Sequence, residues 1–311
     1  MSNLYQITII VCTYNPDYSK LISTLRSIVL QQNVNMQIVI ADDGSKYSYK
    51  DEIAKFFLSY PGVKYEFSNN NTNVGTVNNI YNAILKAKGE YTYVISPGDY
   101  FFSENTLAGI YGFSVKNQIE IAFGKSQYYR RNCNNIELIK QMNPSSPEIY
   151  NKRWLSKQMK ALAYCTTQGI VGACFFRKTE TFREYLEIIK NMSKYDEDNA
   201  STYIHLLLYD KSVYFYNEYV VWYEFGSGIS TSENNSFLKI LEDDCNRVLS
   251  YINAKKKQQL IPFVLLKEKR DRIINYPLLC ARYYIVKKIG NRMTYTDYLT
   301  STTTFFDEIT K

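Results

Sequence analysis

The stretch Gln37-Ile38-Val39-Ile40-Ala41, followed by Asp42-Asp43-Gly44-Ser45, decides the fold expected for this chain. Its apolar residues are mostly β-branched and form a run too short for a helix, which predicts a buried parallel strand. The two carboxylates and the glycine predict a turn at the strand's carboxyl end. Ligands of open α/β sheets bind at that end, so Asp42 and Asp43 are well placed for chemistry. A polar turn before a helix is the alternative interpretation.

Strands alternate with helices through the rest of the first hundred residues. Short β-branched runs predict strands over residues 7–12, 63–67 and 90–95. Apolar residues at helical spacing predict helices from residue 17, over 53–60 and over 77–84, with Gly89 as the C-cap of the third. This alternation predicts an α/β fold with a doubly wound, mostly parallel sheet and helices on both faces.

Composition limits the possible classes of function. The 311 residues are 45% hydrophobic and 22% charged, as in a globular protein. The six cysteines form no Cys-x-x-Cys pair, so we expect free thiols, and the single histidine, His205, is expected to pack in a helix. No apolar run approaches the roughly 18 to 20 residues that cross a bilayer, and no signal-peptide pattern opens the chain. We therefore expect a cytoplasmic protein.

Four motifs follow one another in this half: Thr13-Tyr14-Asn15, Asp42-Asp43-Gly44-Ser45, Asn73-Val74-Gly75 and Asp99. Their order and spacing resemble the nucleotide-binding half of the family 2 glycosyltransferases, which have the GT-A fold and act with inversion. The resemblance covers roughly residues 5 to 230, since matching motifs continue in the second half. These are Thr167-Gln168-Gly169 to Phe175-Phe176-Arg177-Lys178, Tyr195-Asp196-Glu197-Asp198, Trp222-Tyr223-Glu224 and the Gly226 to Ser230 segment.

The resemblance implies a GT-A domain over residues 1–232, with a nucleotide-binding half (1–102) and an acceptor-binding half (103–232). A basic, mainly helical extension (233–311) follows. Within it, segment 255–292 has eleven basic and two acidic residues, a larger positive charge than the +7 of the whole chain. One interpretation is binding to the anionic inner face of the cytoplasmic membrane. The other is a solvated helical face packed on the catalytic domain.

Donor-binding roles also follow from the resemblance. The nucleotide-sugar-binding set that it implies is Thr13, Tyr14, Asn15, Asp42, Asp43, Asn73, Gly75 and Asn78. A carboxylate can accept the N3–H of uracil and a tyrosine ring can stack on it, so Thr13, Tyr14 and Asp43 are expected around the base of a UDP-sugar. Asp42 is expected to orient loop backbone. A helix N-cap is the alternative role for Asp43, and it would not exclude nucleotide contact.

The metal-binding motif departs from the family pattern. Family members usually place a D-x-D motif just beyond strand 90–95, where it holds Mg²⁺ or Mn²⁺ against the diphosphate. Here those positions are Ser96 and Gly98, and only the following acid, Asp99, is present. One carboxylate with phosphate oxygens and waters can still hold a divalent ion, so Asp99 is the expected metal ligand. The alternative is a turn acid.

The resemblance also implies a general base and an acceptor site. Asp198 is the expected base, with Glu197 as its neighbour or substitute, because adjacent acids in one cleft raise the pKa of one of them. The alternative is the acidic first turn of a helix over 199–208. Trp222 and Tyr223 are expected to floor the acceptor site, unless they belong to the core. The loop with Gly226 and Gly228 is expected to order over bound donor.

The implied function is a hexosyltransferase that moves a sugar from a UDP-sugar to a hydroxyl of a saccharide acceptor. Such an acceptor, linked to a lipid diphosphate, would suit a membrane-bound basic segment and the synthesis of O-antigen, capsule or exopolysaccharide. The missing D-x-D leaves a second class open, a catalytically inactive nucleotide- or glycan-binding module. A nucleic-acid binder is least favoured, because apolar patches separate the basic clusters; steep salt dependence would be its signature.

Overall fold

The computed structural model describes residues 4–132, 135–139, 150, 170–226, 228, 236–256 and 299–311. The predicted segment 167–169, most of the glycine loop at 226–230 and the greater part of the basic segment, residues 257–292, lie outside the described residues.

The first four strands form the predicted parallel sheet. They are β1 (Tyr5–Thr13), β2 (Met36–Asp42), β3 (Lys64–Asn69) and β4 (Gly89–Ile95), in the order β3-β2-β1-β4. Thr13 pairs with Asp42, which in turn pairs with Asn69, so the carboxyl ends of three strands lie at one edge. The buried apolar residues of β1 and β2 account for this arrangement, because strands covered on both faces lack a polar side.

The second half of the chain extends the same sheet. Its strands are β5 (Tyr100–Phe101), β6 (Ile121–Asn132), β7 (Asn135–Ile139), β8 (Phe175–Lys178) and β9 (Tyr214–Glu224). The order continues from β4 through β8, β6 and β9 to β5, and β7 pairs with β6. β8 is antiparallel to both β4 and β6, whereas β9 is parallel to β6. The fold is thus a mixed, mostly parallel α/β sheet.

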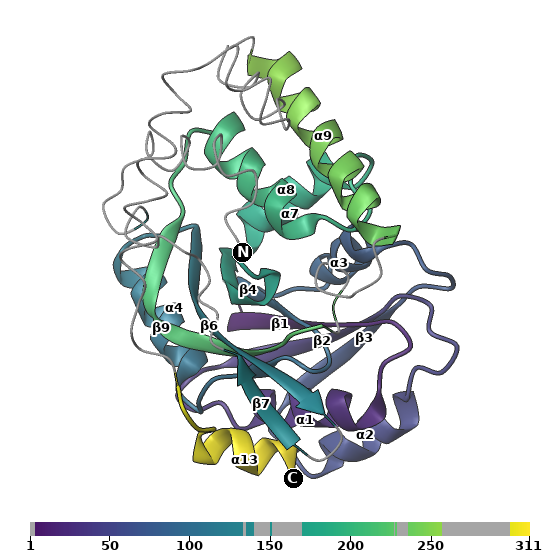
Figure 1. The fold of residues 1–311 in the computed structure, drawn as a ribbon, viewed down its shortest axis with the longest axis vertical. Coiled ribbons are helices and arrows are strands. Elements are labelled where there is room, and N and C mark those ends of the chain that lie inside the picture. The colour runs from purple at the N-terminus through teal and green to yellow at the C-terminus, as the bar shows by residue number, and fades with distance from the viewer. Residues whose placement is uncertain are drawn as a thin grey trace.

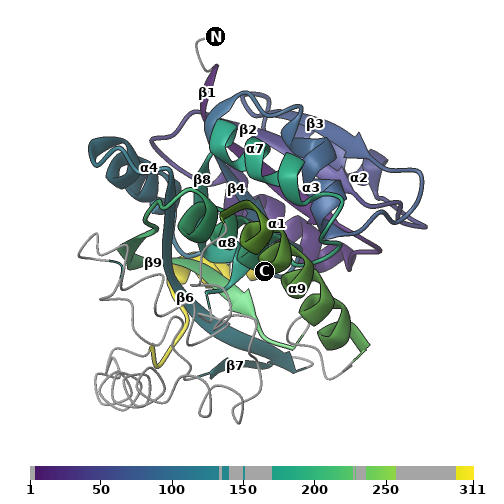
Figure 2. The same ribbon diagram turned by 90° about the horizontal axis from the view of Figure 1, so that it is seen from above.

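Helices cover both faces of the sheet, as predicted. Figure 1 shows α3 (Thr76–Ile84), α7 (Thr179–Ile189) and α8 (Glu197–Tyr203) on one face of the parallel strands, and α1 (Tyr18–Val29) and α2 (Lys50–Leu58) on the other. The view from above in Figure 2 places α4 (Thr106–Lys116) at the opposite end of the sheet from α2. A 3₁₀ turn, η1 (Gly172–Cys174), precedes β8, and a π-helical turn, η2 (Ile204–Leu208), extends α8.

The described parts of the C-terminal extension pack on this domain. Helix α9 (Ser236–Lys256) lies against α8, and Lys256 forms an ion pair with Asp210. Helix α13 (Thr304–Thr310) returns to α1, where Arg26 Nη1 donates to the carbonyl of Ile309 at 3.0 Å. These two helices thus pack on the domain, whereas segment 255–292, to which the membrane interpretation applies, lies almost entirely outside the described residues. None of the helices in the described ranges is both long and apolar enough to span a bilayer.

The structure contradicts the predicted helix cap at Gly89 and confirms the predicted packing of His205. Gly89 does not cap a helix: α3 ends at Ile84, and Gly89 is the first residue of β4. A Cβ atom there would lie 2.3 Å from the backbone nitrogen of Thr8, so close strand packing explains this glycine. His205 packs in the helix as predicted, with Nδ1 2.8 Å from the hydroxyl of Tyr185, and burial lowers its pKa to about 4.

Candidate active site

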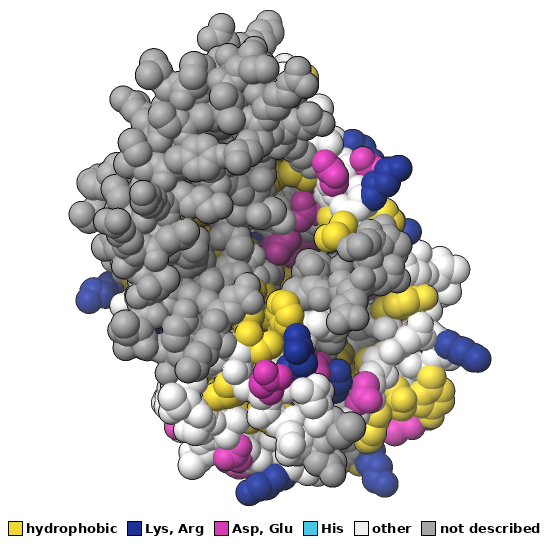
Figure 3. Space-filling model, viewed as in Figure 1, with side chains coloured by type: hydrophobic (Ala, Val, Ile, Leu, Met, Phe, Trp, Pro, Cys, Tyr) yellow, Lys and Arg dark blue, Asp and Glu magenta, His cyan; other side chains and the backbone are white. Residues whose placement is uncertain are grey.

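A cleft of about 880 Å³ opens at the carboxyl ends of β1, β2 and β4. The predicted site residues that line it are Thr13, Tyr14, Asp43, Asn73, Asp99, Glu197, Asp198 and Tyr223. The three carboxylates expected from separate parts of the chain, Asp43, Asp99 and Asp198, thus share one cavity. Acidic side chains are visible in the hollow at the centre of the surface in Figure 3.

The loops after β1 and β2 are joined by side chains at the edge of the cleft. Asp42 Oδ1 accepts the hydroxyls of Thr13 at 2.9 Å and Ser45 at 2.5 Å. Ser45 Oγ in turn accepts the backbone N–H of Asn15 at 2.7 Å, and Asn15 Oδ1 accepts that of Lys46 at 2.9 Å. Asp42 and Asn15 do not line the cleft, and their bonds fix the loops that carry Thr13 and Tyr14.

Asp43 lies beside the N-terminus of α3. Its Oδ1 accepts the backbone N–H of Val74 at 2.8 Å and the side chain of Asn70 at 3.1 Å, and its Oδ2 accepts the N–H of Gly75 at 3.0 Å. The N-cap of its own following helix, α2, is Tyr49, so Asp43 stabilises the start of a different helix. A carboxylate oxygen accepts two hydrogen bonds, which leaves Oδ2 with one further acceptor site.

The acids at the start of α8 have different surroundings. Asp196 is the N-cap residue and is buried, and burial followed by the charge of Asp198 raises its pKa well above the usual range. Asp198 is half-buried and lines the cleft, and its Oδ1 accepts the N–H of Asn199 at 2.9 Å. Gly172 leaves room for it, since a Cβ at that position would lie 3.1 Å from Asp198 Oδ2.

Glu197 is held by a fully buried arginine. Arg177 Nη2 lies 3.0 Å from Glu197 Oε1, and the guanidinium is 4.5 Å from the ring centres of both Phe175 and Phe182. Burial raises the pKa of Glu197 to about 7, although the charge of Arg177 opposes the rise. Of the two predicted catalytic acids, Asp198 is therefore the more accessible and Glu197 the more enclosed.

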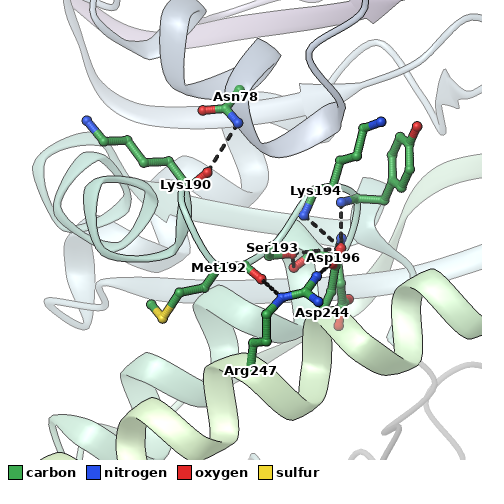
Figure 4. A network of polar contacts seen from close by, with 9 residues as sticks. Asn78, Lys190, Met192, Ser193, Lys194, Asp196, Asp244 and Arg247 are labelled. Atoms are coloured by element: carbon green, nitrogen blue, oxygen red, sulfur yellow. Dashed lines mark hydrogen bonds and ion pairs between the residues drawn. The ribbon is translucent and has the colours of Figure 1, made fainter.

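The loop that leads into α8 is fixed from α9 (Figure 4). Asp244 Oδ2 accepts the backbone N–H groups of Lys194 at 2.8 Å and Tyr195 at 2.7 Å, and the hydroxyl of Ser193 at 3.1 Å. On the other side, the carbonyl of Lys194 accepts the N–H of Val77 in α3 at 3.1 Å. The loop thus joins α9 to the donor-side helix.

Gly75 and Asn78 belong to this junction and do not line the cleft. Gly75 has a φ of +88°, and a Cβ atom there would lie 2.5 Å from the Lys194 side chain. The side chain of Asn78 donates to the carbonyl of Lys190 at 3.2 Å, as Figure 4 shows. Both residues join α3 to the loop before α8.

Comparison with known proteins places this geometry in a family. Residues 8–200, more than half of the chain, match the model of glycosyl transferase family 2. The chain belongs to this family. An uncharacterized glycosyltransferase of Mycoplasma genitalium, MG025, is 32% identical over 108 residues, which cover 34% of this chain. The matching part spans only about a third (35%) of that relative's length.

Solved structures share the fold. Residues 1–349 of S. aureus TarS in complex with UDP-GlcNAc superpose with a TM-score of 0.57 at 16% identity, covering 87% of this chain and 73% of that chain. The mannosyltransferase PcManGT from Pyrobaculum calidifontis, solved with GDP-Man and Mn²⁺, gives a TM-score of 0.50 at 13% identity, covering 94% and 88%. At these identities the likeness supports the GT-A fold alone.

The residues at the family's metal positions, 96, 98 and 99, offer no exposed carboxylate to a divalent ion. Ser96 is exposed, Gly98 has no side chain, and Asp99 is buried with Oδ1 accepting the N–H of Glu224 at 3.2 Å. Burial raises the pKa of Asp99 to about 8, which disfavours its charged form. Within the described ranges, no three His, Cys, Asp or Glu side chains gather in a metal-binding group. The expectation of Mg²⁺ or Mn²⁺ at Asp99 thus has no support from its surroundings.

The sequence did not predict that an ion pair lies in the cleft. Lys20 of α1 and Glu224 at the end of β9 both line it, with Lys20 Nζ 2.7 Å from Glu224 Oε2. Glu224 could have been predicted, because it belongs to the motif Trp222-Tyr223-Glu224 that resembles the family's closing segment. Nothing in the sequence marks Lys20, because its partner lies 204 residues away.

The acceptor-site prediction requires one correction. Trp222 is fully buried and stacks on Phe102 at 5.2 Å and against Phe306 at 4.6 Å, so it belongs to the core and cannot floor a binding site. Successive strand residues point to opposite faces, which leaves Tyr223 on the cleft side. Helix α9 adds a wall that the sequence did not predict, formed by Phe237, Leu238, Leu241, Glu242 and Cys245.

Proposed function

We propose that this protein is an inverting glycosyltransferase that moves a hexosyl group from a UDP-sugar to a hydroxyl of a saccharide acceptor. The observation that carries the proposal is the shared cleft, which gathers Asp43 from the donor side and Asp198 from the acceptor side of a family 2 fold. Residues 1–102 would then bind the donor, and residues 103–232 the acceptor.

Donor binding rests on the loops at the ends of β1 and β2. Tyr14 is 55% exposed at the cleft, so its ring is free to stack on a base, and Asp43 keeps one acceptor site on Oδ2 for an N–H donor such as the N3–H of uracil. Asn73 and Thr13 line the same side. The choice of UDP is supported by the TarS structures, which hold UDP and UDP-GlcNAc.

Transfer requires a base on the acceptor side. Asp198 would take the proton of the acceptor hydroxyl while that oxygen attacks the anomeric carbon and the bond to the diphosphate breaks. Attack opposite the leaving group inverts the anomeric configuration. Glu197, enclosed by Arg177, would position the first turn of α8 rather than touch the substrate.

The acceptor side combines an aromatic and an apolar surface. Tyr223 and Tyr195 line the cleft together with Phe237 and the 49%-exposed Leu238 of α9. Aromatic faces pack on sugar rings, and the apolar wall suits the lipid-proximal part of a lipid-diphosphate-linked saccharide. We propose such an acceptor in bacterial surface polysaccharide synthesis at the inner face of the cytoplasmic membrane, with segment 255–292 as the membrane contact.

A panel of nucleotides and nucleotide sugars tests the donor class. A ligand that binds only the folded state raises the melting temperature, and the stabilisation grows with the logarithm of its concentration relative to its dissociation constant. We expect UDP and at least one UDP-hexose to raise it by several degrees, and GDP or CDP derivatives to have little effect. Stabilisation by GDP-sugars alone would overturn the choice of UDP. Stabilisation by UDP without turnover of any UDP-sugar would favour an inactive binding module.

A further inference from the structure

The ion pair between Lys20 and Glu224 lies where the family's diphosphate-bound metal would be expected. Both side chains line the cleft beside Asp99, the residue that follows the altered D-x-D positions. Glu224 is only 6% exposed in its side chain, whereas that of Lys20 is 27% exposed. The carboxylate is thus the enclosed partner, and the ammonium is the partner open to the cleft.

Gly98 shows that Glu224 replaces the missing acid in space. The backbone at Gly98 has a φ of +101°, and a Cβ atom there would lie 2.4 Å from Glu224 Oε2. A side chain at position 98 would require this carboxylate to shift, and the positive φ disfavours any residue other than glycine there. The second D-x-D position therefore has no side chain, and β9 brings a carboxylate to the same place from the other side of the cleft.

Lys20 supplies the cation that this carboxylate holds. Its Nζ is 2.7 Å from Glu224 Oε2, which uses one of the three N–H donors of an ammonium group and leaves two for other acceptors. Protein kinases use the same device, a lysine that contacts phosphates and is held by an ion pair with a glutamate. A diphosphate bound in this cleft would contact the ammonium group of Lys20, which Glu224 holds in place.

We propose that Lys20, oriented by Glu224, binds the diphosphate of the donor and that donor binding needs no divalent metal. The inference rests on the proposed function, since it assumes a nucleoside diphosphate donor. It goes further by assigning the neutralising charge to a lysine in place of a metal ion.

Calorimetric titration of the full chain with UDP, in 1 mM MnCl₂ or in EDTA, tests the proposal. We expect the two dissociation constants for wild type to agree within about threefold. Lys20→Met should weaken UDP binding at least tenfold in both buffers, Lys20→Arg should restore part of the loss, and Glu224→Gln should weaken binding as well. Lys116→Met, an exposed lysine of α4 outside the cleft, is the matched control and should bind UDP like wild type.

Three results would overturn the inference. The first is UDP binding that EDTA abolishes and Mn²⁺ restores, which would leave the glycosyltransferase proposal intact. The second is unchanged affinity in Lys20→Met, with thermal melts confirming that the variant is folded. The third, absence of UDP binding in both buffers, would also overturn the donor assigned under the proposed function.

Discussion

Asp244 Oδ2 on α9 accepts the backbone N–H of Tyr195 at 2.7 Å, across 49 residues of sequence. This bond and its neighbours fix the loop that ends at the acids of α8. A helix of the C-terminal extension thereby holds the acceptor side of the cleft in place, in addition to lining it.

Replacing this carboxylate tests the role of α9. Both carboxylate oxygens of Asp244 face hydrogen-bond donors. In Asp244→Asn one oxygen becomes an amide N–H₂ group, which leaves buried donors facing one another without an acceptor, and such unpaired donors are costly. We expect urea unfolding to show a loss on the order of 2 to 4 kcal/mol, with a lower kcat for sugar transfer. Asp243→Asn, at the exposed neighbouring position, is the control. Equal effects of the two variants would contradict a specific role for Asp244.

Asp43→Asn tests the donor side. The carboxylate accepts the N–H groups of both Val74 and Gly75, and an amide can accept only on one side. We expect at least tenfold weaker UDP binding by calorimetry and a stability loss on the order of 1 to 3 kcal/mol. Asp51→Asn, on the exposed first turn of α2, should change stability by a few tenths to about 1 kcal/mol and leave UDP binding unchanged. Wild-type UDP affinity in Asp43→Asn would show that this acid has no part in donor binding.

The contribution of Asp99 to stability should fall as pH rises. Its pKa rises from an ordinary value of 3.8 to about 8, mainly through burial, with Glu224 and Lys20 facing it. Between these values the folded state binds more protons than the unfolded state, so the free energy of unfolding decreases with pH, by at most about 1.4 kcal/mol per pH unit for one group. Urea unfolding of wild type and Asp99→Asn at pH 5, 6, 7 and 8 measures this contribution.

The difference in the free energy of unfolding between wild type and Asp99→Asn should change across the pH range. We expect wild type to lose stability more steeply than Asp99→Asn from pH 5 to 8. Glu197, with a pKa raised to about 7, adds a similar but smaller slope that both proteins share. Parallel stability curves would show that Asp99 is ionised throughout, and would restore it as a metal-ligand candidate.

Helix α13 should contribute to stability and not to binding. Phe306 is fully buried between Trp222, at 4.6 Å, and Tyr129, at 5.2 Å. Phe306→Ala should cost about 3 to 5 kcal/mol by urea unfolding, with UDP affinity unchanged under folding conditions. The exposed neighbour Asp307→Ala should have little effect on either quantity. A Phe306→Ala variant as stable as wild type would place α13 outside the core.

The parallel strands and their acidic ends could be predicted because local patterns specify them. β-Branched runs without a polar face predict buried strands, and the residues after such strands lie at one edge, as Asp43 and Asp99 do. The same reasoning cannot assign partners that meet only in the folded chain. The bonds of Lys20 to Glu224 and of Arg26 to Ile309 join residues 204 and 283 positions apart.

Some residue types suit two roles, such as an aromatic residue in the core or in a binding site. Their burial in the folded chain shows which role each residue has. Trp222 and Tyr223 are adjacent aromatics with the same local pattern, and only the alternation of the strand separates core from cleft. Gly89 follows a helix closely enough in sequence to suggest a C-cap, but the helix ends at Ile84, and the close contact of Gly89 with Thr8 depends on pairing with β1. Periodicity thus indicates that a face is buried without identifying what buries it.

Asp198→Asn is the most direct test of the account. The proposed mechanism makes this carboxylate the base for sugar transfer, whereas the donor is bound from the other side of the cleft. With a UDP-hexose and an acceptor saccharide identified by screening, the measurement is UDP release in parallel with UDP affinity. The account predicts that turnover falls at least 100-fold while the dissociation constant for UDP stays within threefold of wild type. Turnover near the wild-type rate in this variant would contradict it.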